Sequence, residues 1–406
     1  MHAPDIDLSV HASKLRVLNE IRRRGRVARV DIARATALSR PTVTALTAEL
    51  IGDGLVVETG GEPETSSTPS SSPSQRGRPP VLLGLNPDAH YVFGVKIAPH
   101  RVAVSIANFV GEVIASHAIT VRAGHRSARE VAGLVAAGIE ETARISGLPV
   151  GRAAGVGIGL PGFIDNDTGI CRWSPVFAEA DVDFRAMMEG LVGGPVEIDN
   201  DANMVALAEK WFGLGRDASD FVVVTMEHGV GMGLVIDDKL HRGAMRFGSE
   251  FGHTKIRPDG ALCRCGQRGC VEAYVADYAL VRDASVFMAT GDISDPIEVQ
   301  RAVDELVAAA RAGDENALAL YRRAGEMLGL GLANLINILN PALVILSGRA
   351  MLASDLFWDV LVEAVDRNSV SAVRGTTRIQ IHPLGDDTWA QGGAALVLER
   401  LYRPAR

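Results

Sequence analysis

The stretch from Gly248 to Ala273, GSEFGHTKIRPDGALCRCGQRGCVEA, decides how the rest of the chain is interpreted. It holds three of the four cysteines, Cys263, Cys265 and Cys270, and His253 precedes them in an H-x9-C-x-C-x4-C pattern. Three thiolates and one imidazole satisfy a tetrahedral structural zinc site, and such a closed set leaves no position for a substrate. Buried free thiols or a disulfide are the alternative. Clustering in a chain so poor in cysteine favours the metal, and we predict a zinc ion that braces the fold.

Two carboxylates flank these metal ligands. Glu250 lies three residues before His253, and Glu272 lies two residues after Cys270. A loop folded around zinc would present both carboxylates from a rigid base to a common cavity. Carboxylates held in this way accept hydrogen bonds from the hydroxyls of a polyhydroxylated ligand. The stretch therefore predicts a ligand site beside the metal.

The run Glu250-Phe251-Gly252-His253, followed by C-R-C-G-Q-R-G-C-V-E, resembles the ROK family, which groups sugar-responsive transcriptional repressors with sugar kinases. One departure is Ser249, which stands where the family usually has glycine. We expect a small shift of the loop there, without loss of any ligand.

Length, composition and net charge limit the possible classes of protein. A chain of 406 residues is long enough for two or three domains, and 47% hydrophobic with 22% charged residues is ordinary for a soluble protein. The net charge of -8 gives no global electrostatic case for nucleic acid. No run of about twenty apolar residues exists, and the N-terminal stretch has no apolar signal core. We expect a cytoplasmic protein without membrane contact, in a compartment that keeps thiols reduced.

The first sixty residues carry a local charge of the opposite sign. From Lys14 to Thr42, nine lysines and arginines stand against Glu20 and Asp31 only, an excess of seven positive charges. This asymmetry suits a phosphate-binding module. Helical periodicity predicts three helices, with Leu15, Leu18 and Ile21 on the first, Val30, Ile32 and Ala33 on the second, and Val43, Leu46 and Leu50 on the third.

The third helix has the start signals of a recognition helix. Ser39 is a natural N-cap, and Pro41 is tolerated in the first turn. We predict that Arg40, Thr42 and Thr44 face the major groove of double-stranded operator DNA. Residues 54–58 would form a wing strand paired with residues 81–85, which gives a winged helix-turn-helix domain over residues 1–85. A small helical bundle with a solvated basic face is the alternative.

A segment rich in Ser, Pro, Thr and Gly, residues 60–80, lies between the two wing strands and predicts a flexible wing or linker. It ends in a compact basic turn containing Arg76 and Arg78, which could place an arginine in a narrow minor groove. A solvated wing tip is the alternative. ROK repressors resemble the chain here too, since they commonly carry a Gly-Arg-Pro run at this point.

Residues 86–406 alternate between strand and helix patterns, which predicts an α/β architecture. Strands are expected at residues 91–97, 101–106, 113–117, 154–158, 196–198, 221–226, 233–236 and 343–346, and a helix at 127–146. The helix pattern from Gly325 to Leu339 is either core or a dimer contact, and core is favoured. The family resemblance implies a two-lobed, actin-like sugar-kinase fold, with the ligand bound between the lobes.

Three further stretches match the family and imply site residues. The run from Gly157 to Asp165 resembles the loop that approaches the sugar, and Trp173-Ser174-Pro175 resembles the segment after it. The run from Glu197 to Asn203 resembles the strand end that carries the sugar-contacting Asn and Asp. The residues that the resemblance assigns to sugar are Gly159, Pro161, Gly162, Asn200, Asp201, Glu250, His253 and Glu272.

Asp201 aligns with the general base of the kinase members, which deprotonates the attacking hydroxyl. For Asn200 and Asp201 the alternative is a turn that caps the helix starting near Ala202. For His253 the resemblance implies two roles, as metal ligand and as cavity wall, which its two ring nitrogens allow.

The residues from Lys96 to His100, KIAPH, argue against phosphoryl transfer. ROK kinases have a D-x-G-G-T run at this hairpin to hold the nucleotide phosphates. Here lysine replaces the carboxylate, and Pro99 removes a backbone amide donor. We therefore predict a non-enzymatic, sugar-sensing repressor, a homodimer or dimer of dimers on a palindromic operator, with a sugar or sugar-phosphate effector that changes cleft closure. A sugar kinase with a DNA-binding arm and a regulator controlled by a protein partner are the alternatives.

Overall fold

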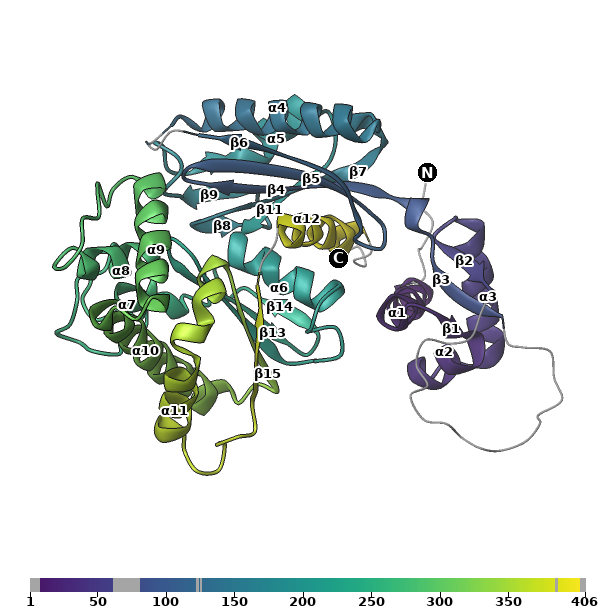
Figure 1. The fold of residues 1–406 in the computed structure, drawn as a ribbon. Helices are drawn as coiled ribbons and strands as arrows, with labels where there is room; N and C mark the ends of the chain where they lie inside the picture. Colours follow the sequence, from purple (N-terminus) through teal and green to yellow (C-terminus); the bar gives the residue numbers. More distant parts are fainter. Residues whose placement is uncertain (1–7, 61–80, 122–123, 125, 384–385, 402–406) are drawn as a thin grey trace.

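The computed structural model describes residues 8–60, 81–121, 124, 126–383 and 386–401. Arg76 and Arg78, with the predicted flexible segment, lie outside the described residues. Within the described part, a small N-terminal domain stands beside two larger lobes (Figure 1).

The N-terminal domain has the predicted winged helix-turn-helix elements. They are α1 (Leu8–Arg24), β1 (Val27–Ala28), α2 (Arg29–Thr36), α3 (Arg40–Gly52), β2 (Val56–Thr59) and β3 (Leu82–Leu85). The wing strands β2 and β3 pair antiparallel, as predicted. Ser39 caps α3, because its hydroxyl accepts a hydrogen bond from the Thr42 amide at 3.2 Å.

The core of this domain confirms most of the predicted apolar positions. Ile21, Ile32, Val43 and Leu50 are fully buried. The assignment of Val30 to the buried face was wrong. Val30 is the second residue of α2 and faces solvent with 39% of its surface exposed, while Ile32 and Ala33 take the inner positions.

The first lobe is built on a five-stranded sheet of order β11-β7-β4-β5-β6. Its elements are β4 (Tyr91–Ala98), β5 (Arg101–Asn108), β6 (Val113–Thr120), α4 (Ala128–Ser146), β7 (Ala153–Leu160), β8 (Phe163–Asp165), β9 (Ile170–Trp173), β10 (Val182–Asp183), α5 (Phe184–Val192) and β11 (Val196–Asn200), with 3-10 turns at Pro87–Ala89 and Val150–Arg152. Strands β8, β9 and β10 form a separate small sheet. Helices α4 and α5 cover one face of the large sheet (Figure 1).

The second lobe repeats this topology. Its sheet has the order β14-β13-β12-β15-β16, in which the first three strands in sequence form an antiparallel meander and the last two add in parallel, as in the first lobe. Its elements are α6 (Asp201–Trp211), β12 (Phe221–Met226), β13 (Val230–Ile236), β14 (Lys239–His241), α7 (Glu272–Val275), α8 (Asp277–Ala284), α9 (Pro296–Arg311), α10 (Glu315–Leu339), β15 (Leu343–Ser347), α11 (Trp358–Asn368) and β16 (Arg378–His382), with 3-10 turns at Phe251–His253 and Arg349–Leu356. The predicted two-lobed α/β fold is confirmed.

Helix α10 is core, as expected. Leu328, Leu332, Leu335 and Ile336 are each less than a tenth exposed, whereas Ile338, close to the C-terminal end of the helix, is 80% exposed. The helix begins at Glu315, earlier than the predicted start at Gly325, because Asp314 supplies an N-cap that the periodicity alone did not reveal.

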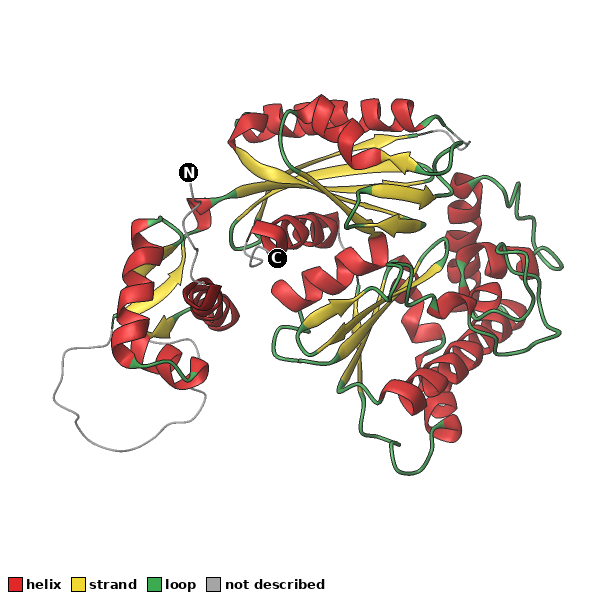
Figure 2. Cartoon of the chain, turned by 180° about the vertical axis from the view of Figure 1, so that it is seen from behind, coloured by secondary structure: helices red, strands yellow, loops and turns green. Residues whose placement is uncertain are grey.

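Two helices lie between the two large sheets. Helix α6 follows the first lobe directly, and the last helix, α12 (Asp386–Leu401), returns beneath the sheet of that lobe (Figures 1 and 2). The side chains of Val205 and Trp389, from α6 and α12, share a buried cluster with Phe221 and Ile345 of the second sheet. These two helices therefore join the lobes through apolar contacts.

The N-terminal domain is anchored to the far end of α6. The guanidinium of Arg22, on α1, donates to the Trp211 carbonyl at 2.8 Å and lies 4.4 Å from the centroid of its indole ring. Burial lowers the pKa of Arg22 to about 10, so that the side chain stays charged at neutral pH. Among the helices that the structure describes, none is both long and apolar enough to span a membrane.

Candidate functional site

The four predicted metal ligands come together. The ligand atoms of His253, Cys263, Cys265 and Cys270 all lie within 4.8 Å of one another. The Nδ1 atom of His253 lies 3.6 Å from the Cys263 sulfur, and the sulfurs of Cys265 and Cys270 are 3.7 Å apart. This donor set fits one metal ion, and its three sulfurs suit a thiophilic metal.

Tight backbone turns bring the closely spaced sulfurs onto one centre. Gly269 has a φ of 74°, and a Cβ at this position would lie 1.7 Å from the Arg257 carbonyl oxygen, so only glycine fits. The Cys263 amide donates to the Gln267 carbonyl at 2.8 Å, and the Gly266 amide to the Cys263 carbonyl at 3.0 Å. The loop is thus held by its own backbone around the cysteines.

Three predicted carboxylates gather next to this loop. The pKa of Glu250 is raised by partial burial and by the charges of Glu272 and Asp201, while His253 opposes the shift. The Nε2 atom of His253 lies 4.0 Å from a Glu250 oxygen, so the imidazole presents one nitrogen to the thiols and the other to the carboxylate. His253 thus lies between the thiols and Glu250, and its predicted contact with sugar stays a prediction.

Glu272 already has protein partners. One of its oxygens accepts from the Val230 amide at 3.2 Å, and the other lies 3.4 Å from both the Cys263 sulfur and the Tyr278 hydroxyl. Its side chain therefore ties the metal loop to β13. Its predicted contact with sugar stays a prediction.

Asn200 and Asp201 stand at the start of α6, where the predicted glycine loop meets them. The Asn200 side chain accepts from the Ala202 amide at 2.9 Å and donates to the Gly162 carbonyl at 3.1 Å. The capping role considered for Asn200 is thus real, and the other end of the same side chain holds the glycine loop. Burial raises the pKa of Asp201, as does the Glu227 carboxylate, while Lys96 lowers it.

The glycine loop has structural reasons of its own. A Cβ on Gly159 would lie 2.2 Å from the Met204 sulfur, so this glycine lets β7 pack on α6. The Pro161 carbonyl accepts from the Ser174 hydroxyl at 2.6 Å. The structure therefore gives Gly159 a packing role and brings Pro161, Gly162 and Asn200 together.

Lys96, the residue that replaces the kinase carboxylate, bridges the two lobes. Its ammonium lies 2.6 Å from a Glu227 oxygen at the end of β12 and 3.7 Å from the centroid of the Trp389 ring. The Lys96 side chain is only 12% exposed. A half-buried ion pair thus joins the two lobes at this point.

Beside this pair, His100 of the first lobe contacts His228 of the second. Their ring nitrogens Nδ1 and Nε2 are 3.1 Å apart, and the other nitrogen of His228 lies 3.8 Å from an Asp277 oxygen. Burial, reinforced by His100, lowers the pKa of His228 to about 4. Burial, reinforced by Glu227, raises the pKa of Asp277 to about 7. The low polarity of this buried site thus favours the neutral forms of His228 and Asp277.

The predicted DNA-contacting residues lie at the exposed N-terminal end of α3. Arg40, Thr42 and Thr44 are exposed at its N-terminal end, while Val43, Leu46 and Leu50 point into the domain. The Thr44 hydroxyl donates to the Arg40 carbonyl at 2.9 Å. Their contact with DNA stays a prediction.

Sequence reasoning missed the partners that lie far away in the chain. Glu227 pairs with Lys96, and Arg242 donates to the buried Asp199 carboxylate at 2.7 Å, directly before the Asn200 site. No local pattern marks either pair, because their members are separated by more than forty residues. For the Lys96–Glu227 pair, the only signal in the sequence was the presence of a single basic residue, Lys96, within an apolar strand pattern.

Comparison with known proteins identifies both parts of the chain. The ROK family matches residues 92–400, and a winged helix-turn-helix DNA-binding domain matches residues 11–57. A xylose repressor of Caldicellulosiruptor bescii is 32% identical over 391 residues, which cover 95% of each chain. A glucokinase of Thermotoga maritima is 33% identical over 256 residues, 61% of this chain and 80% of the relative.

A solved ROK family transcriptional regulator, a homologue of the E. coli MLC protein, shares the fold. The two align with a TM-score of 0.78 at 24% identity, covering 98% of this chain and 97% of the other. The likeness extends over the N-terminal domain and both lobes. The protein belongs to the ROK family and carries a winged helix-turn-helix DNA-binding domain ahead of the two-lobed ROK domain.

Proposed function

We propose that the protein is a sugar-responsive transcriptional repressor, in which a sugar bound between the lobes changes the affinity of the N-terminal domain for operator DNA. The observation that carries this proposal is the Lys96–Glu227 ion pair, which stands at the hairpin where kinase members hold nucleotide phosphates. The full-length similarity to a xylose repressor supports the same function. The ligand acts by preferring one state of the cleft.

The effector is an uncharged sugar, such as the xylose named for that relative. Asp201, Glu250 and Glu272 offer carboxylate oxygens to hydroxyl groups. The ammonium of Lys96 lowers the pKa of Asp201, but it is already paired with Glu227. The carboxylates therefore outnumber the available positive charges, which disfavours a phosphate group, so we favour a free sugar over a sugar phosphate.

The metal is zinc with a structural role. Three thiols and an imidazole close together supply the four ligands that a tetrahedral structural zinc needs, with no position left open. The zinc supplies a rigid centre for the loop, and His253 and Glu250 extend from that centre towards the cleft.

The DNA-binding unit is a homodimer or a dimer of dimers. Two copies of α3 with Arg40, Thr42 and Thr44 would read the half-sites of a palindromic operator in successive major grooves. Residues 1–85 form the DNA-binding domain and residues 86–406 the sugar-binding domain. A protein that binds operator DNA in this way acts in the cytoplasm.

A sugar kinase is the second candidate, favoured by the similarity to glucokinases. It requires a place for the nucleotide phosphates. Pro99 has no amide to donate there, and Lys96 and Glu227 occupy the adjoining space. We therefore expect no phosphoryl transfer.

A thermal-shift screen of the zinc-loaded protein tests the proposal, because a ligand that binds only the folded state raises the melting temperature. We expect one neutral sugar to raise it and magnesium with ATP to leave it unchanged. The same sugar should then weaken operator binding in a gel-shift assay. Asp201→Ala should abolish the sugar shift, and Asp359→Ala, an exposed carboxylate on α11, is the matched control.

ATP turnover with any hexose would instead establish the kinase. A folded protein that responds to no sugar would favour control by a protein partner.

A further inference from the structure

Three aromatic side chains from both lobes meet beside the proposed sugar site. Phe163 begins β8, Trp173 ends β9 on the neighbouring strand, and Phe247 comes from the loop after β14 in the second lobe. The ring centroids are 5.9 Å apart for Phe163 and Trp173 and 5.6 Å apart for Phe163 and Phe247. We call these three residues the aromatic platform.

The platform is open to solvent. Trp173 is 51% exposed and Phe163 is 37% exposed, although both are large apolar side chains on one hairpin. Adjacent exposed aromatic rings of this kind mark a binding surface more often than isolated ones do. The platform is therefore a candidate for ligand contact.

The platform is continuous with the loop of the proposed sugar site. Phe163 directly follows Gly162, whose carbonyl accepts from Asn200. Gly162 has a φ of 122°, and a Cβ there would lie 2.1 Å from the Trp173 carbonyl oxygen, so the two strands touch at this point. On the other side, Phe247 lies three residues before Glu250. A ligand leaving the cleft at Gly162 meets these rings.

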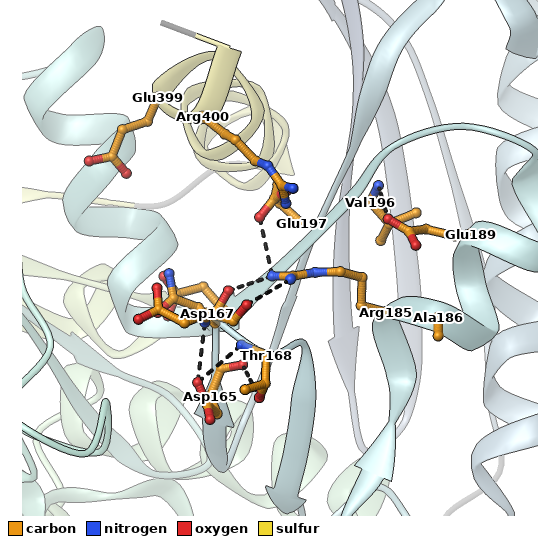
Figure 3. A network of polar contacts seen from close by, with 12 residues as sticks. Asp165, Asp167, Thr168, Arg185, Ala186, Glu189, Val196, Glu197, Glu399 and Arg400 are labelled. Carbon is orange, nitrogen blue, oxygen red and sulfur yellow. Dashed lines mark hydrogen bonds and ion pairs between the residues drawn. The ribbon is translucent and has the colours of Figure 1, made fainter. Parts of the chain in front are cut away.

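The hairpin that carries the platform is braced by polar contacts (Figure 3). The Asp165 carboxylate accepts from the Asp167 and Thr168 amides at 3.2 Å and 3.3 Å. Arg185, on α5, donates to the Asp167 carbonyl at 3.1 Å and pairs with Glu197 at 3.3 Å. The turn is thus fixed from the side of β11, the strand that ends at Asn200.

A contact from the second lobe completes the brace. The Asp167 carboxylate pairs with the guanidinium of Arg246, which is the residue before Phe247. The ion pair and the Phe163–Phe247 ring contact therefore lie side by side across the two lobes. A platform fixed in this way loses little conformational entropy when a ligand binds.

The chemistry of the platform suits a sugar ring. A pyranose has a face of C–H groups that an aromatic ring can cover, while its hydroxyls point outward to polar groups. Charged side chains border the platform and can bond those hydroxyls: Arg172, which pairs with Asp181 at 3.0 Å, and the Asp167–Arg246 pair. An apolar surface with a polar rim is the usual composition of a small-molecule site.

We propose that the aromatic platform is a subsite for a second sugar ring, and that the effector is a disaccharide or another glycoside. The proposal rests on the function proposed above, which places the first ring near Asp201. Of the groups proposed for that first ring, Glu272 is buried and Asp201 is half-buried, whereas Trp173 is 51% exposed. A ligand that touches both extends outward by one further ring.

The test compares monosaccharides with the matching disaccharides, xylose with xylobiose and glucose with cellobiose and maltose, by isothermal titration of the zinc-loaded full chain. We expect one disaccharide to bind about tenfold or more tighter than its monosaccharide. Trp173→Ala should remove that gain and leave monosaccharide affinity unchanged, and Trp173→Phe should restore most of it. Phe287→Ala, a 38% exposed aromatic beyond α8, is the matched control and should change neither affinity.

Three outcomes would overturn the subsite. Monosaccharide binding without any gain for a disaccharide would overturn the subsite alone and leave the proposed function standing. Equal weakening of both ligands by Trp173→Ala would assign the platform to the first ring. Absence of binding by every sugar would overturn both the subsite and the proposed function.

Discussion

Ser249 is a strained residue at the edge of the metal loop. Its φ is 74°, a left-handed conformation that side chains with a Cβ rarely adopt, and its buried hydroxyl has no hydrogen-bond partner among the described residues. The sequence marked this position as a departure from the glycine usual in the family. The structure shows that the loop keeps the glycine conformation and that serine is strained in it.

Ser249→Gly should therefore stabilise the protein. Removing the strain and the unpaired hydroxyl should raise the free energy of unfolding by about 1–2 kcal/mol. Urea unfolding of the zinc-loaded protein measures this change. Ser249→Ala is the control, because it removes the hydroxyl and keeps the strained Cβ, so it should recover only part of the gain. A less stable glycine variant would show that the backbone is not strained.

The buried carboxyl of Asp277 makes stability depend on pH. Its folded pKa of about 7 is raised by burial above the unfolded value near 3.9, so the folded state holds a proton that the unfolded state loses. Its contribution to stability is present below pH 4 and is lost as the pH rises to 7. His228, with a folded pKa of about 4, contributes in the opposite sense between pH 4 and 6.5.

Asp277→Asn should match the wild type in stability near pH 4 and exceed it at pH 8 by up to about 4 kcal/mol, because the amide never pays for ionisation in a buried site. Urea unfolding at pH 4.5, 6 and 8 measures the difference between the two proteins. A difference that stays constant with pH would mean that Asp277 is ionised in the fold throughout this range.

At the scale of elements, the sequence predicted the features that depend on local sequence signals. The N-cap of α3 at Ser39, the wing pairing of β2 with β3 and the convergence of the four metal ligands are set by residues close in sequence, and all three are present. The Lys96–Glu227 pair and the aromatic platform were not predicted, because each joins residues of different lobes. Only the fold brings them together.

The metal loop is the element whose stability depends most on one ligand set. Cys265→Ser should reduce the zinc content well below one ion per chain and should lower the melting temperature, since the free energy of metal binding contributes directly to loop folding. Metal analysis together with a thermal melt measures both effects. Cys171→Ala, which alters the one cysteine outside the cluster, should keep the full zinc content.

A Cys265→Ser variant with unchanged zinc would contradict the four-ligand site. The loss of stability should also appear when a chelator removes the metal from the wild type, and it should be reversed by added zinc. Chelation should have little further effect on the Cys265→Ser variant.

At the scale of the whole molecule, the repeated lobes follow from the alternation of strand and helix, and the family resemblance supplied their arrangement. The predicted domain boundary at residue 85, the sugar contacts and the oligomeric state stay predictions. Strand ends were predicted too short in several cases, because the periodic pattern fades where β7 and β11 run on into the site.

Helix α6 connects the two functions of the molecule. Its first residue is Asp201, and its last is Trp211, against which Arg22 of the DNA-binding domain stacks. A sugar that moves the start of this rigid helix therefore moves the surface that holds α1.

Arg22→Ala should leave sugar affinity unchanged and reduce the effect of sugar on operator affinity to within about threefold, below the range usual for allosteric coupling. Titrating operator DNA with and without saturating sugar measures that effect. Arg24→Ala, on the same helix but paired with Glu20, removes the same charge and should keep the full response. An unchanged response in Arg22→Ala would show that the signal reaches the DNA-binding domain by another contact, such as the buried packing of Phe109 and Val397 against it.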